Sequence, residues 1–93
     1  MVVRKTGSVK LEAGTNKLQL PVGAQIIGFD AVGQLRAVYD APGDMFGTTP
    51  VELVVVPAGE EFKVDADGYQ VLGTASPTGS RPVIVYQVFN FPG

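Results

Sequence analysis

Hydrophobic and polar residues alternate in short runs along this chain, and glycine or proline separates each run from the next. A period of two residues is the pattern of a β-strand with one buried face. No window between the breakers is long enough to favour a helix. The pattern predicts about seven strands, with one further short piece at 61–64. The predicted strands span residues 8–12, 17–20, 24–32, 34–40, 51–56, 69–75 and 82–91.

The most hydrophobic run covers residues 82–91 and consists mainly of β-branched and aromatic residues. It contains no charged residue. An uncharged strand of this kind at the edge of a sheet would expose a template for aggregation. We therefore expect this strand to lie in the centre of its sheet, with a neighbour on each side.

The predicted strands 24–32 and 34–40 are expected to form a hairpin. Gly33 lies between them and can adopt the positive φ that a tight turn requires. Strict alternation then assigns the faces of the two strands. Gln25, Ile27, Phe29 and Ala31 share one face, and Leu35, Ala37 and Tyr39 share the matching face of the partner.

Short strands at this spacing, without helices, indicate an all-β fold. We expect a small antiparallel sandwich or a closed barrel, and the sequence leaves both open. The 93 residues fit a single domain, 1–93, in which residues 1–15 could form a separable N-terminal arm. A chain of this length buries roughly 60–65% of its unfolded surface, so the core is expected to be modest.

The longest predicted connection, residues 40–50, has an apolar pair at its middle. Met45 and Phe46 are flanked there by glycine, proline and aspartate. Such a pair either folds back over the edge of the core or enters a pocket on a partner. Methionine and aromatic side chains are well suited to the second role. The loop 76–82, which presents Arg81, is expected to be an exposed turn or a second contact.

Charge is distributed unevenly, although the net charge is only −2. Residues 1–20 carry four cations and one carboxylate, and the remaining residues have an excess of carboxylates. Arg4, Lys5 and Lys10 are either solvated side chains of a first strand or a basic segment that docks on an acidic neighbour, including a second copy of the chain. Dispersed cations do not form the concentrated basic face that nucleic-acid binding requires, so we expect no nucleic-acid partner.

The residue types available for catalysis are few, because the chain contains no histidine and no cysteine. These are the usual residues for acid–base chemistry at neutral pH and for zinc sites. The serines Ser8, Ser76 and Ser80 are each flanked by glycine or proline, a turn-like context, and are expected to have a structural role rather than a catalytic one. We therefore expect no enzyme activity, no cofactor and no small-molecule substrate.

Carboxylates offer one further possibility at residues 65–68, which read Asp-Ala-Asp-Gly. The spacing resembles the start of a calcium loop, but it is equally the composition of a hairpin turn. Either a turn or a weak calcium site formed together with Glu60 and Glu61 is possible. We expect the turn and no bound metal.

Targeting signals are not apparent in the chain. No run approaches the roughly 18 apolar residues that a membrane span needs. The first residues, Met-Val-Val-Arg-Lys-Thr, lack the apolar region of a signal peptide. We expect a protein made in the cytoplasm with no membrane partner.

Three segments resemble short uncharacterised β-proteins encoded by bacteriophages. These segments are residues 20–27 (LPVGAQII), 71–74 (VLGT) and 85–89 (VYQVF). The corresponding pattern in these proteins is a leading LPxGAxI, a central VxGT and a closing hydrophobic strand that ends in VF. The chain departs from it after Thr74, where Ala75-Ser76-Pro77 replaces a common Gly-His pair.

The resemblance implies a viral origin and two possible functions. One is a virion accessory protein, such as a capsid decoration (cement) protein that stabilises neighbouring shell subunits and works as a homo-oligomer. Its location would be the virion, assembled in the host cytoplasm, and its partner a capsid or other virion protein. The alternative is a free intracellular binding module that inhibits a host factor. In both cases Met45, Phe46, Arg4, Lys5, Lys10 and Arg81 are the expected partner-binding residues.

Overall fold

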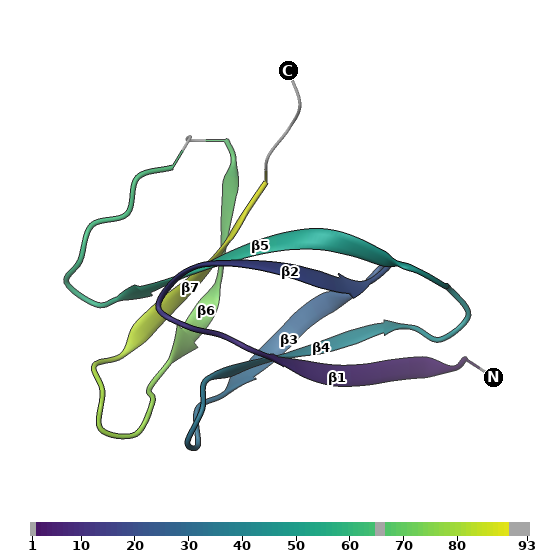
Figure 1. Ribbon diagram of the computed structural model, residues 1–93, viewed down its shortest axis with the longest axis horizontal. Coiled ribbons are helices and arrows are strands. Elements are labelled where there is room, and N and C mark those ends of the chain that lie inside the picture. The colour runs from purple at the N-terminus through teal and green to yellow at the C-terminus, as the bar shows by residue number, and fades with distance from the viewer. Residues whose placement is uncertain (1, 65–66, 90–93) are drawn as a thin grey trace.

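The alternating pattern folds into antiparallel strands in the computed structural model, which describes residues 2–64 and 67–89 (Figure 1). Within this part of the chain there are seven strands and no helix. The strands are β1 (Arg4–Lys10), β2 (Gly14–Pro21), β3 (Gln25–Asp30), β4 (Arg36–Pro42), β5 (Thr48–Pro57), β6 (Tyr69–Ala75) and β7 (Val83–Val88).

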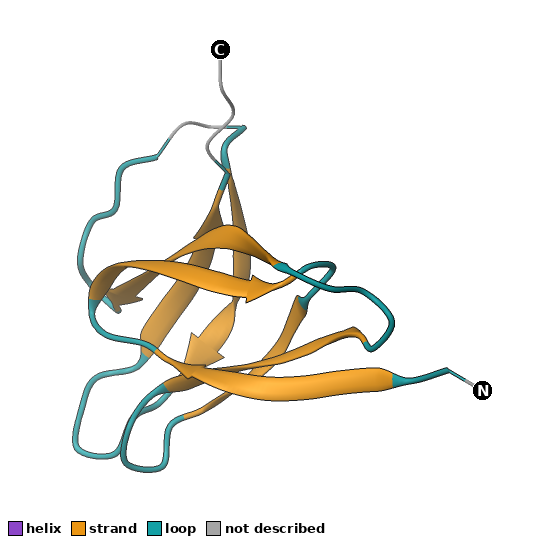
Figure 2. Ribbon diagram, turned by 45° about the vertical axis from the view of Figure 1, so that its right-hand side comes forward, coloured by secondary structure: helices purple, strands orange, loops and turns teal. Residues whose placement is uncertain are grey.

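The strands form two sheets that pack as a sandwich (Figure 2). One sheet has the order β1-β4-β3, and the other has the order β2-β5-β7-β6. The all-β prediction is confirmed, and of its two forms the structure is the sandwich. The sheets approach each other at one side, where Phe29 of β3 lies against Gly73 of β6. A Cβ on Gly73 would be 3.3 Å from the Phe29 ring, so the small residue permits this close approach.

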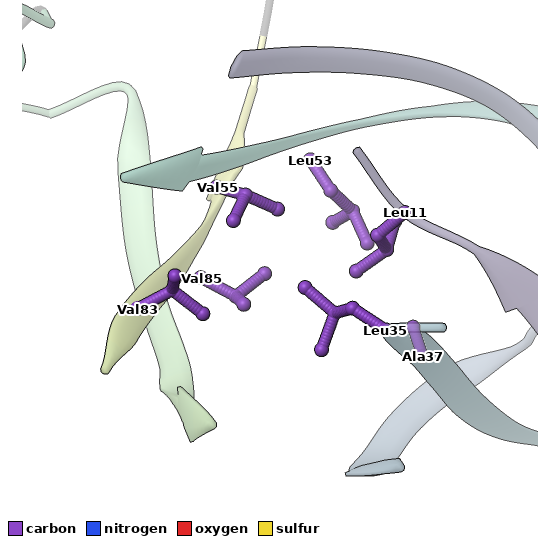
Figure 3. Close-up of a cluster of buried hydrophobic side chains, with 7 residues drawn as sticks. All are labelled: Leu11, Leu35, Ala37, Leu53, Val55, Val83 and Val85. Atoms are coloured by element: carbon purple, nitrogen blue, oxygen red, sulfur yellow. The ribbon is translucent and has the colours of Figure 1, made fainter. Parts of the chain in front are cut away.

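The core lies between the two sheets and is built from aliphatic side chains (Figure 3). Burial of these side chains is the main favourable term for folding, because it removes apolar surface from water. Val9, Ile26, Phe29 and Leu72 extend this cluster at its margin. The buried members are Leu11, Leu35, Ala37, Leu53, Val55, Val83 and Val85.

The hydrophobic strand near the C-terminus is central, as predicted. Strand β7 pairs with β5 on one side and with β6 on the other. Its ends differ from the prediction, because the strand covers 83–88 rather than 82–91. Residues 90 and 91 of the predicted strand lie outside the described residues.

The predicted face of β3 is wrong because the strand contains a β-bulge. The register with β4 shifts between Ile26 and Gly28, which leaves Ile27 as an extra residue. A bulge of this kind breaks the period of two, so residues three apart can point to the same side. Ile26 and Phe29 therefore pack against the core, whereas Ile27 is 62% exposed.

The bounds of the other strands before β6 also differ from the prediction. The first strand runs from Arg4 to Lys10 rather than over 8–12, and it pairs with β4 along its whole length. Residues 4–10 of the segment 1–15 thus form an edge strand of the three-stranded sheet. Strands β4 and β5 extend into the predicted 40–50 loop, which shortens it to residues 43–47.

The short strand predicted at 61–64 is absent, and these residues form irregular structure instead. Phe62 lies on the ring of Tyr86, with the ring centroids 4.9 Å apart. Tyr69 meets the same ring edge-on at 6.0 Å. The segment therefore covers the outer face of the four-stranded sheet through aromatic packing rather than through strand pairing.

Candidate functional site

The loop between β4 and β5 crosses from one sheet to the other at the end of the sandwich where β1 begins (Figure 1). Its first residue is fixed by a hydrogen bond in which the N–H of Gly43 donates to the carbonyl oxygen of Val3 at 2.8 Å. Its last residue accepts from the N–H of Val22, which lies 3.2 Å from the carbonyl oxygen of Gly47. The loop therefore projects Met45 and Phe46 from two anchored ends.

Four apolar side chains at this end of the molecule are exposed to solvent. Phe46 is 88% exposed and Met45 is 41% exposed. Val2 and Val3, just before β1, are 79% and 64% exposed, and Val3 lies directly against Gly43. We call Val2, Val3, Met45 and Phe46 the apolar tip. The sequence left two alternatives for the Met45–Phe46 pair. The side chain of Phe46 does not fold back over the core but projects into solvent.

Lys5 connects β1 to the apolar tip. Its Nζ donates a hydrogen bond to the carbonyl oxygen of Met45 at 2.8 Å. The same nitrogen lies 6.0 Å from the centroid of the Phe46 ring, at the outer limit of a cation–π contact. The ammonium group thus orients the loop and places a positive charge beside the exposed ring.

The positive charge of Arg4 is paired with a carboxylate on the neighbouring strand β4. Its guanidinium donates to both carboxylate oxygens of Asp40, with distances of 2.9 and 3.3 Å to Oδ2 and 3.2 Å to Oδ1. These hydrogen bonds hold the pKa of Asp40 below its usual value and raise the pKa of Arg4. Because the pair is solvent-exposed, it adds little stability, and its main effect is to hold the side chain of Arg4, the first residue of β1, against β4.

Lys10 and Arg81 lie apart from the apolar tip. Lys10 is at the opposite end of β1, with Nζ 3.8 Å from Oε1 of Glu12. Arg81 donates to the carbonyl oxygen of Ala58 at 3.3 Å and lies 4.0 Å from Glu60. Of the six predicted partner-binding residues, the structure therefore brings together Arg4, Lys5, Met45 and Phe46.

The sequence prediction did not include Val2 and Val3. Their signal was an apolar pair immediately before two cations, but nothing local placed it beside the 43–47 loop. The antiparallel register of β1 and β4 does so, since Arg4 pairs with Pro42. This pairing brings the residues before β1 next to the residues after β4.

The proposed calcium turn falls partly outside the described residues, which exclude 65 and 66. Among the residues that the structure describes, no group of three acidic, histidine or cysteine side chains could hold a metal ion. The same part of the chain contains no helix long and apolar enough to cross a membrane.

Comparison with known proteins adds no further information about this site, since no protein-family model, curated protein or solved structure matches the chain.

Proposed function

We propose that this chain is a non-enzymatic accessory protein that attaches to a larger protein assembly through its apolar tip. In the specific form of this proposal, the assembly is a bacteriophage capsid and the chain is a decoration protein that stabilises neighbouring shell subunits. The observation that most supports attachment is the 88% exposure of Phe46 on a loop that is anchored at both ends.

The apolar tip has the features of an anchor for a partner pocket. Large exposed aromatic and methionine side chains are enriched at the centres of protein interfaces, where they fill pockets and exclude water. Anchoring of the loop lowers the entropy that would be lost when Phe46 enters a pocket. The partner surface is therefore expected to be an apolar pocket that accepts the Phe46 ring.

The charges around the tip define the rim of this contact. Arg4 already has a carboxylate partner in Asp40, so Lys5 is the cation that remains beside the Phe46 ring. A partner carboxylate at the pocket edge would meet this ammonium group. Rim charges of this kind affect the approach and register of a complex more than its affinity.

The resemblance to phage β-proteins supports the virion as the location of the protein. Copies bound to adjacent shell subunits would contact one another, so we propose that the protein works as a homo-oligomer. Light scattering of the purified chain over a range of concentrations measures whether copies associate without the shell.

A mass-spectrometric count in purified particles tests the decoration function. Peptides of this chain, quantified against peptides of the major shell protein, are expected in a fixed ratio to the shell subunits. Particles purified through a second density gradient provide the control for adhering protein. If the chain is abundant in infected cells but absent from particles, the decoration function is wrong and the host-factor inhibitor becomes the better proposal.

A further inference from the structure

Strand β1 has an edge that pairs with no other described strand. It is the outer strand of the three-stranded sheet and pairs with β4 along its whole length. The other outer strand of this sheet, β3, lies against β6. The end of β7, the last described strand, lies away from β1 in both Figure 1 and Figure 2. We call the side of β1 that faces away from β4 the open edge.

Two hydrogen bonds that flank the β1–β4 ladder show which backbone groups point to the open edge. Gly43 donates to the carbonyl oxygen of Val3, and Leu11 donates to the carbonyl oxygen of Leu35. The backbone groups of successive residues in an antiparallel strand point to opposite sides, so the odd-numbered residues of β1 bond to β4. The N–H and C=O groups of the even-numbered residues therefore point outward. These residues are Arg4, Thr6, Ser8 and Lys10.

The open edge is suited to strand pairing, because nothing in β1 interrupts it. The register with β4 continues over seven residues without a bulge, and β1 contains no proline. Every outward residue therefore has an N–H to donate and a C=O to accept. The three residues at the middle of the strand, Thr6, Gly7 and Ser8, have small side chains that leave room for a neighbouring strand.

The charges at the open edge are positive. Arg4 and Lys10 are exposed at the two ends of β1, and the strand contains no carboxylate. The carboxylates that they contact lie outside β1, in Asp40 of β4 and in Glu12. Lys10 also lies directly opposite Arg36 in the β1–β4 register, and like charges in this position are unfavourable. A strand that approaches the open edge therefore meets cations first.

We propose that the open edge binds an extended acidic segment of a partner protein as an added antiparallel strand, with carboxylates opposite Arg4 and Lys10. The outward N–H and C=O groups of β1 supply the backbone hydrogen bonds, as in other cases of β-strand addition. Opposite charges across neighbouring strands add to the stability of the pair. At Lys10, the added carboxylate also offsets the repulsion from Arg36.

The same charges argue against a second copy of the chain as the occupant. Antiparallel pairing of β1 with β1 over its whole length places Arg4 of one copy opposite Lys10 of the other. Cations on an edge strand are a common protection against such self-pairing. They repel a second basic strand and attract an acidic one, so the partner segment differs from β1 in charge.

The test uses the full chain and a seven-residue peptide with acetylated and amidated ends. Its sequence, Glu-Val-Thr-Val-Thr-Val-Glu, places a carboxylate opposite both Arg4 and Lys10. Amide chemical shifts of the protein are followed by NMR during titration. We expect saturable shifts that are larger at the even-numbered residues of β1 than at the odd-numbered ones. The Kd should be on the order of 1 mM, because a short flexible peptide loses conformational entropy on binding.

Two kinds of control peptide separate charge from backbone pairing. A peptide with lysine in place of both glutamates should bind more than tenfold more weakly. In the antiparallel arrangement the threonines lie opposite Thr6 and Ser8 and donate their N–H groups to β1, whereas the central valine lies opposite Gly7 and its N–H points away. N-methylation of both threonines should therefore abolish binding, and N-methylation of the central valine should leave it nearly unchanged.

Variants of the protein provide the second arm. Thr6→Pro removes one outward N–H without removing a bond to β4, and proline is tolerated at such edge positions. It should weaken peptide binding more than tenfold, whereas Thr6→Ala, which keeps the N–H, should bind as the wild type does. Lys10→Glu should weaken binding of the glutamate peptide, and Lys17→Glu on β2 is its matched control. If Thr6→Pro does not melt cooperatively, the N-methylated peptides decide alone.

Four results would overturn the proposal: no saturable shifts, shifts located away from β1, equal binding of the glutamate and lysine peptides, or equal binding of the two N-methylated peptides. Concentration-dependent shifts in β1 without peptide would identify a second copy as the occupant and would also contradict it. The inference goes beyond attachment through the apolar tip, because it requires no contact with Met45 or Phe46. The double variant Met45→Ser/Phe46→Ser should bind the peptide normally, so either site can fail its test while the other passes.

Discussion

At the scale of single residues, Gly43 determines how the start of the chain packs against the 43–47 loop. A Cβ at this position would lie 2.7 Å from the carbonyl oxygen of Val3, which is backbone and has little freedom to move. We expect Gly43→Ala to lower the free energy of unfolding by about 1–3 kcal/mol through overpacking. Gly28→Ala is the control, because a Cβ there meets nothing within 4 Å. Chemical denaturation measures both, and equal stability of the two variants would contradict the close contact.

The Arg4–Asp40 pair predicts a pH dependence at the same scale. Hydrogen bonds from Arg4 lower the pKa of Asp40 from its usual 3.8, so the folded state favours the ionised carboxylate. The pair therefore stabilises the fold above about pH 4, and this contribution disappears as the pH falls through the lowered pKa. The Tm difference between wild type and Asp40→Asn should be small but measurable at neutral pH and should shrink as the pH falls below 3.8 and through the lowered pKa of Asp40. If the Tm difference persists at acid pH, the stabilising effect of Asp40 comes from a contact other than its ion pair with Arg4.

At the scale of elements, the position of each strand in its sheet predicts its local stability. Strands β4 and β7 and the residues of β5 that pair with β7 have neighbours on both sides, whereas β1, β2, β3 and β6 are at sheet edges. Amides in a doubly paired, buried ladder open only with global unfolding. We expect hydrogen exchange to be slowest at residues 37–39, 53–56 and 84–87 and faster in β1. Slowest exchange in β1 would contradict the strand order.

Much of the element pattern was predictable from sequence, and the exceptions have specific physical causes. The sequence located β6 between its flanking turn residues and the central β7 by its lack of charge, although the register of β6 with β7 shifts between Val71 and Gly73. Alternation missed the first half of β1, since the inward positions there are Lys5 and Gly7 rather than apolar residues. Gly7 leaves room for the Tyr39 ring, whose hydroxyl would lie 2.5 Å from a Cβ. The bulge at Ile27 was missed because an extra residue has no signature in alternation.

The candidate site was predictable to the same limited extent. Met45 and Phe46 could be identified from sequence because they form an apolar pair within a loop rich in glycine and proline. Their exposure follows from this local context. The contact of Lys5 with the Met45 carbonyl oxygen and the proximity of Val3 to Gly43 depend on pairing between β1 and β4. Such long-range register is not encoded in any one segment. It therefore emerged only from the folded structure.

At the scale of the whole molecule, the apolar tip is expected to be dispensable for folding. Phe46 is exposed and Met45 is partly exposed, and the core lies between the sheets. Replacing both with serine should therefore change the free energy of unfolding by less than about 1 kcal/mol. Thermal and chemical denaturation measure this directly. A large loss of stability would mean that the tip is part of the folded core.

The most direct test of the proposed attachment is binding of the purified chain to phage particles that lack it. Bound copies per particle are counted after sedimentation for the wild type and for Met45→Ser/Phe46→Ser. We predict saturable binding of the wild type and at least about tenfold weaker binding of the double variant, as expected when interface anchors are removed. Equal binding of the two proteins, or no binding of the wild type, would contradict attachment through the apolar tip.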